Sequence, residues 1–447
     1  MGKRMTPAHI GLVSAVALAA SIGLADRAQA ADLGGNCCAD LEERISELEA
    51  TTVRKGNRKV SLTISGWVAE QVMWWDDGTE SNVYVGGVGT TLASHFKLTG
   101  QASIAPGYQA GYVIQVETDT ADPLLVNQND DDANAGINLL QSYWFINSDR
   151  YGRLSLGQLS PASDNTAILV DGSGSLVPAN WVLFDNQNFN LRINGQLTPG
   201  NWGDLAHCNF LAPGQGGLGV SGDCVGVPGN YVRYDSPTFA GFSVSADWGE
   251  DDIWDVAARY AGEFNGVKVA VAASYARSTD LRAFNNAIEN VAVGYFQIGA
   301  FINHMPTGLF LYGAYGHENT DGPQAIVSTM DNSDTWYLKA GLRRKFNTLG
   351  HTVLYGEYGE KNDTLDCGMF GCDGTRNSFA NGSKLKQWGL GIVQEIDAAA
   401  MSMFISYRHF EGEFDCSASC NDSTGNFGLH HEFDDFDLVK FGALINF

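Results

Sequence analysis

The sequence lacks long apolar runs, because no stretch after residue 30 has the roughly 18 consecutive apolar residues that a membrane-spanning helix needs. A helical membrane protein is therefore excluded. Proline is scarce, with 11 residues in 447, whereas glycine is abundant at 53 and aromatic residues make up 11% of the chain. A glycine- and aromatic-rich chain without long apolar runs suits a large β-barrel whose interior holds water rather than a packed core.

Basic residues are also few, with 27 Lys and Arg against 51 Asp and Glu. The chain opens with Lys3 and Arg4, continues with an apolar segment over residues 10–20 and reaches Ala28-Gln29-Ala30. This order is typical of a secretory signal peptide, so we expect residues 1–30 to be cleaved and the mature protein to be exported. The mature chain would keep 24 of the basic and 50 of the acidic residues, a net charge of −26. So acidic a chain is not expected to bind nucleic acid.

Motifs of catalysis are missing from the sequence. It contains no G-x-S-x-G, no H-E-x-x-H and no glycine-rich phosphate loop before a helix. His95 and His409 are the histidines that we place within strands, and neither lies in a nucleophile motif. We therefore expect no enzyme activity, no cofactor and no metal site. One alternative metal set does not repeat the spacing of zinc ligands: Cys416, Cys420, His430, His431 and Glu432.

Eight cysteines are present, and disulfides are the default state of cysteine in an exported protein. Their spacing predicts three local pairs, each within one expected loop: Cys208–Cys224, Cys367–Cys372 and Cys416–Cys420. The adjacent Cys37 and Cys38 cannot readily pair with each other, because their side chains diverge. We interpret them as candidates for disulfides between chains.

From Val60 to the end, short apolar-polar alternations are separated by turns that are alternately short and long. The last strand shows the pattern clearly: Val439, Phe441, Ala443, Ile445 and Phe447 share one face. Bacterial outer-membrane barrels have an even strand number, short periplasmic turns and long outer loops. We therefore predict an all-β fold, a transmembrane antiparallel β-barrel of about 16 strands over residues 60–447.

Residues 31–59 precede the predicted barrel. Leu41, Ile45, Leu48 and Thr52 follow the four-three spacing of a coiled-coil seam, which predicts a short periplasmic helix. A basic linker, Arg54-Lys55-Gly56-Asn57-Arg58-Lys59, follows it. Two heptads do not hold a coiled coil alone, so association would depend on barrels that are already joined, as in a trimer.

The runs GNCCADLEERI, ELEATT and RKGNRKVSLTISG, which begin at Gly35, Glu47 and Arg54, resemble the opening of the alphaproteobacterial porin family. The resemblance implies a homotrimeric, sixteen-stranded general diffusion porin in the lipid of the bacterial outer membrane. In porins the third outer loop folds into the lumen, which implies that residues 160–229 form the constriction. Its candidate acidic residues are Asp164, Asp171, Asp185 and Asp204. An alternative places the second half of this loop, residues 202–229, as a hat outside the barrel.

Basic residues on the strands are expected to face the lumen, because their strand neighbours on the other face are apolar. A lysine or arginine that faced lipid near the midplane would cost ~2–4 kcal/mol. The candidates for the lumen wall are Lys97, Arg153, Arg233, Arg259, Lys268, Lys339, Arg343, Arg408 and Lys440.

Loop carboxylates facing wall cations would produce a transverse field that penalises apolar solutes. With the net charge of −26, this arrangement predicts mild cation selectivity. We therefore expect passive diffusion of small hydrophilic solutes and ions. Two alternatives stay open: a substrate-specific outer-membrane channel, and a non-conducting structural or adhesive barrel.

Overall fold

A computed structural model of the chain describes residues 60–89, 92–119, 121–133, 136–211, 220–250, 252–283, 288–321, 332–365, 380–416 and 430–447. The predicted signal peptide, periplasmic helix and linker, with Cys37 and Cys38, lie outside these residues. Cys367, Cys372, Cys420 and the side chain of Cys416 lie outside them too. Within the described part of the chain, no helix has the length and apolarity to cross a membrane.

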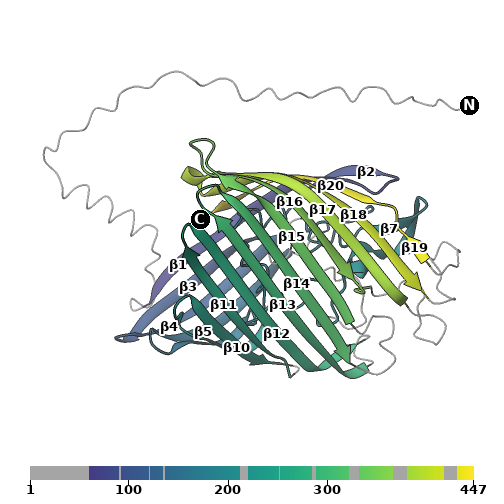
Figure 1. The fold of residues 1–447 in the computed structure, drawn as a ribbon. Helices are drawn as coiled ribbons and strands as arrows, with labels where there is room; N and C mark the ends of the chain where they lie inside the picture. The colour runs from purple at the N-terminus through teal and green to yellow at the C-terminus, as the bar shows by residue number, and fades with distance from the viewer. Residues whose placement is uncertain are drawn as a thin grey trace, which may run out of the picture. The chain divides into compact units, whose positions relative to one another are not determined.

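Sixteen antiparallel strands close into a barrel, as the sequence predicts (Figure 1). The first eight are β1 (Ser61–Asp76), β3 (Ser94–Ala105), β4 (Tyr108–Asp119), β5 (Gly136–Ser148), β6 (Gly152–Leu159), β9 (Gly229–Asp235), β10 (Phe242–Gly249) and β11 (Trp254–Phe264). The second eight are β12 (Val267–Ala283), β13 (Ile288–His304), β14 (Leu309–Asp321), β15 (Asn332–Arg344), β16 (Thr352–Asn362), β17 (Ala380–Ile396), β18 (Met401–Cys416) and β20 (Phe436–Asn446). Two short strands add to the wall, β2 (Ser81–Gly86) beside β1 and β19 (His430–Glu432) beside β18.

The barrel closes between its first and last strands. β1 pairs with β20 from Trp67–Asn446 to Asp76–Asp437, and its earlier part pairs with β3. At the end of this seam, the backbone groups of Gly66 and Phe447 exchange two N–H···O bonds of 3.1 Å. A Cβ atom on Gly66 would lie 2.1 Å from the carbonyl oxygen of His95, so this position of the seam requires glycine.

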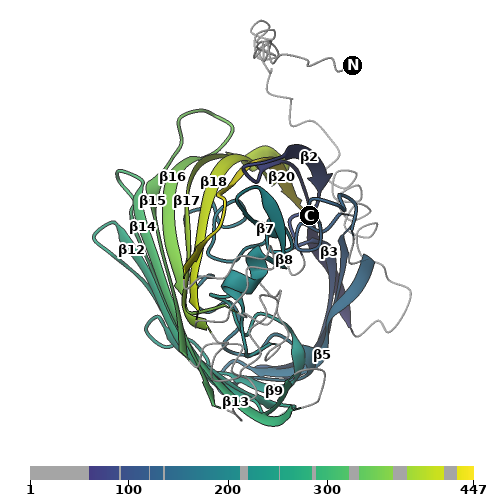
Figure 2. The same ribbon diagram turned by 90° about the vertical axis from the view of Figure 1, so that its right-hand side faces the viewer.

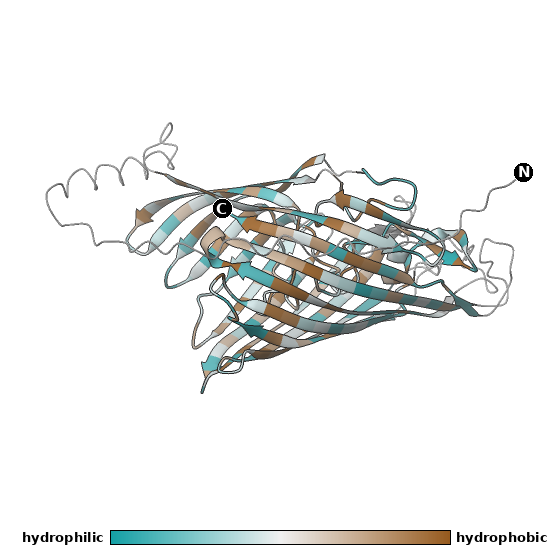
Figure 3. Ribbon diagram, turned by 90° about the horizontal axis from the view of Figure 1, so that it is seen from above, coloured by the Kyte–Doolittle hydropathy of each residue, from teal (hydrophilic) through white to brown (hydrophobic). Residues whose placement is uncertain are grey.

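Apolar side chains cover the outside of the wall, which confirms the alternation read from the sequence (Figure 3). Phe441, Ile445 and Phe447 of the predicted terminal strand are 47%, 44% and 58% exposed. The same face carries Phe242, Val256 and Leu338 on distant strands. In a lipid bilayer this apolar surface faces acyl chains, while closure of the ring leaves the wall without a free edge.

The inside of the barrel is packed on one side. Residues 160–211 and 220–228, hereafter the inner loop, lie within the ring of strands (Figure 2). They carry the hairpin of β7 (Asn190–Ile193) and β8 (Gln196–Asn201) and the 3-10 helix η1 (Trp202–Ala206). Trp181, Phe189 and Trp202 are at most 1% exposed and join apolar clusters with the wall. The composition favours an interior of water over a packed core, but on this side aromatic residues of loop and wall fill the interior.

Candidate functional site: the lumen and its inner loop

The first residues of the inner loop bind two arginines of the wall. Arg233 on β9 donates hydrogen bonds to the carbonyl oxygens of Ser160, at 3.0 Å, and Pro161, at 3.1 Å. Arg259 on β11 donates to the carbonyl oxygen of Ala162 at 2.6 Å. Both arginines point inward, as their strand parity predicts, but their guanidinium groups hold the backbone of the loop.

Acceptors on the same part of the wall bind the loop's N–H groups. Asp247 accepts from a loop N–H, and Asp255 accepts from the N–H of Ser163 at 2.9 Å. Gln297 on β13 accepts from the N–H of Ala167 at 2.9 Å and donates to the carbonyl oxygen of Ser163 at 2.8 Å. Asp247, Asp255 and Gln297 were not among the residues predicted from the sequence. The alternation of apolar and polar residues along β10 and β11 could have indicated that both aspartates face inward.

A glycine lets the loop approach the wall closely. A Cβ atom on Gly299 would lie 2.2 Å from the carbonyl oxygen of Ala167. The same oxygen accepts a hydrogen bond from the hydroxyl of Tyr312 at 2.8 Å. At this point the loop backbone rests directly on β13 and β14, which leaves no room for a solute between them.

Two lysines of the wall form buried ion pairs with the loop. Lys339 on β15 lies 2.6 Å from Asp171, and their side chains are 0% and 2% exposed. Lys440 on β20 lies 2.5 Å from Asp185, with both side chains 3% exposed. Asp185 also accepts from the amide of Gln71 at 3.0 Å. These predicted lumen residues are anchors of the loop rather than groups that a passing solute can contact.

Arg408 forms a third buried anchor. It binds Glu357 on β16 through two parallel hydrogen bonds of 2.7 and 2.9 Å, and it also donates to the carbonyl oxygen of Asn180 in the loop. Two parallel N–H···O bonds make this pair both strong and geometrically specific. Nearby, Lys361 donates to the loop carbonyl of Ser221. Glu357 and Lys361 were not predicted from the sequence, although their positions along β16 place both side chains on its inward face.

Four of the predicted wall cations lie away from these anchors. Arg343 pairs with Glu395 at 2.8 Å, and the Lys268 side chain is exposed on β12. Lys97 on β3 and Arg153 on β6 form no ion pair with any described residue. The predicted wall cations thus divide into residues that hold the loop and residues that stay in contact with open space.

The remaining loop acids also have partners within the loop. Asp204 accepts from the N–H of Asn201 at 2.8 Å and completes the capping box of η1, whose N-cap is Asn201. Asp164 accepts from the amide of Asn165 and faces Asp223. Burial, and then the negative charge of Asp223, raise the pKa of Asp164 well above its ordinary value. The mild cation selectivity stays a prediction, but the carboxylates on which it rests are paired, capped or shifted toward the neutral form.

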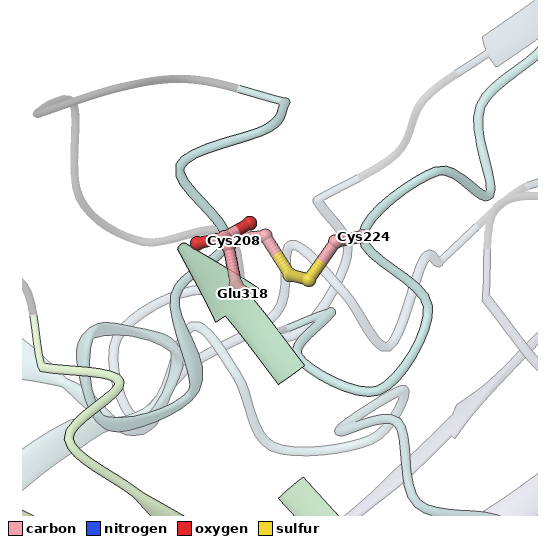
Figure 4. Close-up of side chains that lie close together, drawn as sticks. All are labelled: Cys208, Cys224 and Glu318. Carbon is pink, nitrogen blue, oxygen red and sulfur yellow. A yellow bond between two sulfur atoms is a disulfide. The ribbon is translucent and has the colours of Figure 1, made fainter. Parts of the chain in front are cut away.

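A disulfide joins Cys208 to Cys224, which confirms this predicted pair (Figure 4). Beside it, Glu318 on β14 accepts from the N–H groups of Asn209, at 2.9 Å, and Phe210, at 3.1 Å. The disulfide and the carboxylate together fix the second half of the inner loop against the wall. The described residues of this half therefore contact the inner side of the wall, and do not form the hat outside the barrel that the alternative placed there.

Of the described members of the alternative metal set, His430 and Glu432 come together, beside Glu413, whereas His431 does not join them. The ring of His431 stacks on that of Phe414 at a centroid distance of 4.7 Å. His430 instead lies 2.7 Å from the carboxylate of Asp415, at the rim of the barrel. The sulfur atoms of the set belong to the part of the chain that is not described.

Among the described residues, the cavities that the loop leaves open include two with charged linings. One, of about 740 Å³, is lined by loop residues Val170 and Gly172 and by wall residues that include Lys268 and Arg343. The other, of about 380 Å³, lies against β3–β6 and is lined by wall residues only, Lys97 and Arg153 among them. Polar or charged side chains reach both cavities, so both can hold water and hydrophilic solutes.

The buried pair of Lys339 and Asp171 gives a first prediction. We expect Lys339→Met to lower the free energy of unfolding by about 3–5 kcal/mol, because Asp171 is left buried and unpaired. The double variant Lys339→Met, Asp171→Asn should regain much of this loss. Urea unfolding in lipid vesicles measures the change.

The matched control is Lys345→Met, which removes an exposed lysine paired with Asp397 at 2.7 Å, with side chains 54% and 53% exposed. An exposed ion pair contributes little to stability, so we expect no clear change in the free energy of unfolding for this variant. Equal effects of Lys339→Met and Lys345→Met would contradict the assignment of Lys339 as an anchor.

The pH dependence of stability gives a second prediction. Burial raises the pKa of Asp223 from an ordinary value of 3.8 to about 7. In the window between these values the unfolded chain releases a proton that the folded chain retains. Stability should therefore fall as the pH rises through this window. Asp223→Asn should reduce this fall in melting temperature between pH 4 and pH 7, while Asp149→Asn, in an exposed turn, should not. An unchanged slope in Asp223→Asn would contradict the prediction.

Comparison with known proteins identifies the family. The family model described as Gram-negative porin matches residues 8–415. No curated protein sequence matches the chain.

Solved structures share the fold. The anion-selective porin from Comamonas acidovorans is 16% identical, with 87% of this chain and 100% of that chain covered at a TM-score of 0.54. OmpT of Vibrio cholerae in its trimer form is 11% identical (87% and 99% covered, TM-score 0.50), and Pseudomonas putida OprB is 12% identical (91% and 97% covered, TM-score 0.50). Together with the closed barrel and its hydrophilic lumen, the family match shows that the chain belongs to the Gram-negative porins, which form diffusion channels in the outer membrane.

Proposed function

We propose that this porin is a general diffusion pore whose passage runs between the inner loop and the wall of β3–β6. The observation that supports the proposal is the one-sided packing of the loop. Its ion pairs and hydrogen bonds run to strands such as β9, β13, β15 and β20. The cavity on the side of β3–β6 is lined by wall residues only and offers polar and basic groups to water. Small hydrophilic solutes and ions would pass there by diffusion, without catalysis or a cofactor.

A homotrimer is the assembly that we propose for this chain. One structural neighbour, OmpT of Vibrio cholerae, is described in a trimer form. The heptad spacing of Leu41, Ile45 and Leu48 would give three chains a further contact in the periplasm. We also propose that the signal peptide, residues 1–30, is removed after Ala30 during export.

A substrate-specific channel is the second candidate, and the packed interior favours it. Apolar clusters occupy the side of β13–β18 and extend to β20 and β1, so the open space is smaller than a barrel of sixteen strands would otherwise enclose. A narrow passage with fixed donors can bind a solute as well as pass it. A general pore and a specific channel differ in whether their flux saturates with solute concentration.

Planar-bilayer recording of the purified full-length protein tests the proposed function. For a general pore in a trimer, we expect the conductance to change in steps that come in threes, one for each subunit. The conductance should also rise in proportion to the salt concentration. Saturation at low concentration of one added solute would favour the specific channel. A folded trimer that does not conduct would contradict both candidates.

A further inference from the structure

The cavity against β3–β6 is basic as well as polar. Its charged lining residues are Lys97 and Arg153, and no carboxylate belongs to its lining. The amides of Gln101, Gln109 and Asn147 complete its polar surface. Ammonium, guanidinium and amide N–H groups are donors to anions. This wall therefore offers an anion a set of donors without a competing negative charge.

Neutral neighbours hold Arg153 in place. Its Nε donates to the hydroxyl of Ser155 at 3.1 Å, and Nη2 donates to the hydroxyl of Tyr143 at 3.3 Å. The guanidinium also lies 3.8 Å from the centre of the Phe145 ring. These contacts fix the side chain but do not neutralise it, so its charge stays available to a solute.

Lys97 likewise faces neutral residues on both neighbouring strands. Its register partners are Ser65 on β1 and Gln115 on β4. A carboxylate, Glu117, lies on β4 two residues after Gln115, where it is the register partner of His95. Its side chain is only 2% exposed. Lys97 is thus the accessible charge of this region.

One further acid lies close to Arg153. Asp235 on β9 is its register partner. The carboxylate of Asp235, however, accepts two hydrogen bonds from Arg233, at 2.7 and 3.0 Å, and one from Ser245 at 2.7 Å. Arg233 therefore compensates Asp235, and Arg153 keeps an uncompensated positive charge.

Among its described residues, the inner loop contributes no carboxylate to the lining of this cavity. Asp171 is 2% exposed and paired with Lys339 on β15, which is far from this wall in the strand order. Asp185 is 3% exposed and paired with Lys440 on β20, which β1 separates from β3. In the part of the loop that follows its first anchors, the most exposed large apolar side chain is Leu169, at 70%. The loop can thus narrow the passage without making it acidic.

We propose that the passage prefers small anions, chloride and small carboxylates, and that Lys97 and Arg153 form the site that selects them. This inference rests on the proposed diffusion function and gives the pore a selectivity opposite in sign to the net charge of the chain. Many acids that produce the negative total lie in connections, such as Asp130, Asp131 and Asp132. Charges farther away than a Debye length, about 8–10 Å at 0.1–0.15 M salt, are screened from ions in the passage.

The reversal potential of the full-length trimer in a potassium chloride gradient tests this inference. A unit charge about 5 Å from an ion in water changes its local concentration roughly fourfold. Because the same charge repels potassium, but salt screens it and the ions pass at varying distances, we expect a chloride-to-potassium permeability ratio of roughly 3. Lys97→Gln with Arg153→Gln should lower the ratio to one or below while the channels still open.

Charge-conserving variants keep the test falsifiable if the double variant folds poorly. Lys97→Arg with Arg153→Lys should retain the anion preference, and Lys345→Gln, in an exposed turn, should leave it unchanged. A conducting wild-type pore that prefers potassium would overturn the inference and leave the proposed function standing. A ratio unaffected by the double glutamine variant would also overturn it. A folded trimer without conductance would overturn the pore and the inference together.

Discussion

A charged side chain inside this barrel has two stable surroundings, an opposite charge in a packed interior or water in an open passage. A buried ion without a partner would cost several kcal/mol. Lys339, Arg408 and Lys440 are in the first situation, each within 3 Å of a carboxylate that is almost fully buried. Lys97 and Arg153 are in the second. This division of charges determines which side of the barrel is filled and which side can carry solute.

The apolar groups follow the same division. Trp181, Phe189 and Trp202 enter the interior where the wall also presents aromatic or aliphatic side chains. Gly299 allows the loop backbone to touch the wall at the point of closest approach. Packing and ion pairing thus act on many of the same strands, such as β15, β18 and β20. The loop is better described as a fixed internal partition than as a flexible connection.

The sequence predicted the parts of the structure that depend on local patterns. Alternation identified the outward face of β20, from Phe441 to Phe447, and parity placed Lys440 inside the barrel. The spacing of Cys208 and Cys224 was enough to pair them. The hairpin of β7 and β8 was not predicted, because residues 190–201 lie inside a lumen whose walls come from distant strands.

The partners of the charged residues could not be predicted. Parity indicates the face of a strand but not the depth at which a side chain lies along it. Lys97 and Lys339 therefore read alike in the sequence, although one faces open space and the other is 1% exposed beneath the inner loop. Asp171 likewise read as a constriction residue, and only the register of the loop on the wall pairs it with Lys339. Contacts between a long loop and distant strands determine these roles.

Accessibility to a membrane-impermeant thiol reagent tests the one-sided lumen most directly. Thr99→Cys lies on β3 in the open cavity, whereas Ser274→Cys lies on β12 opposite Gln297, which binds the inner loop. Ser274 is 4% exposed, and its replacement by cysteine changes the side-chain volume little. In the folded trimer the cysteine at position 99 should react quickly and that at position 274 slowly. Equal rates at the two positions would contradict a loop that is packed against one side of the barrel.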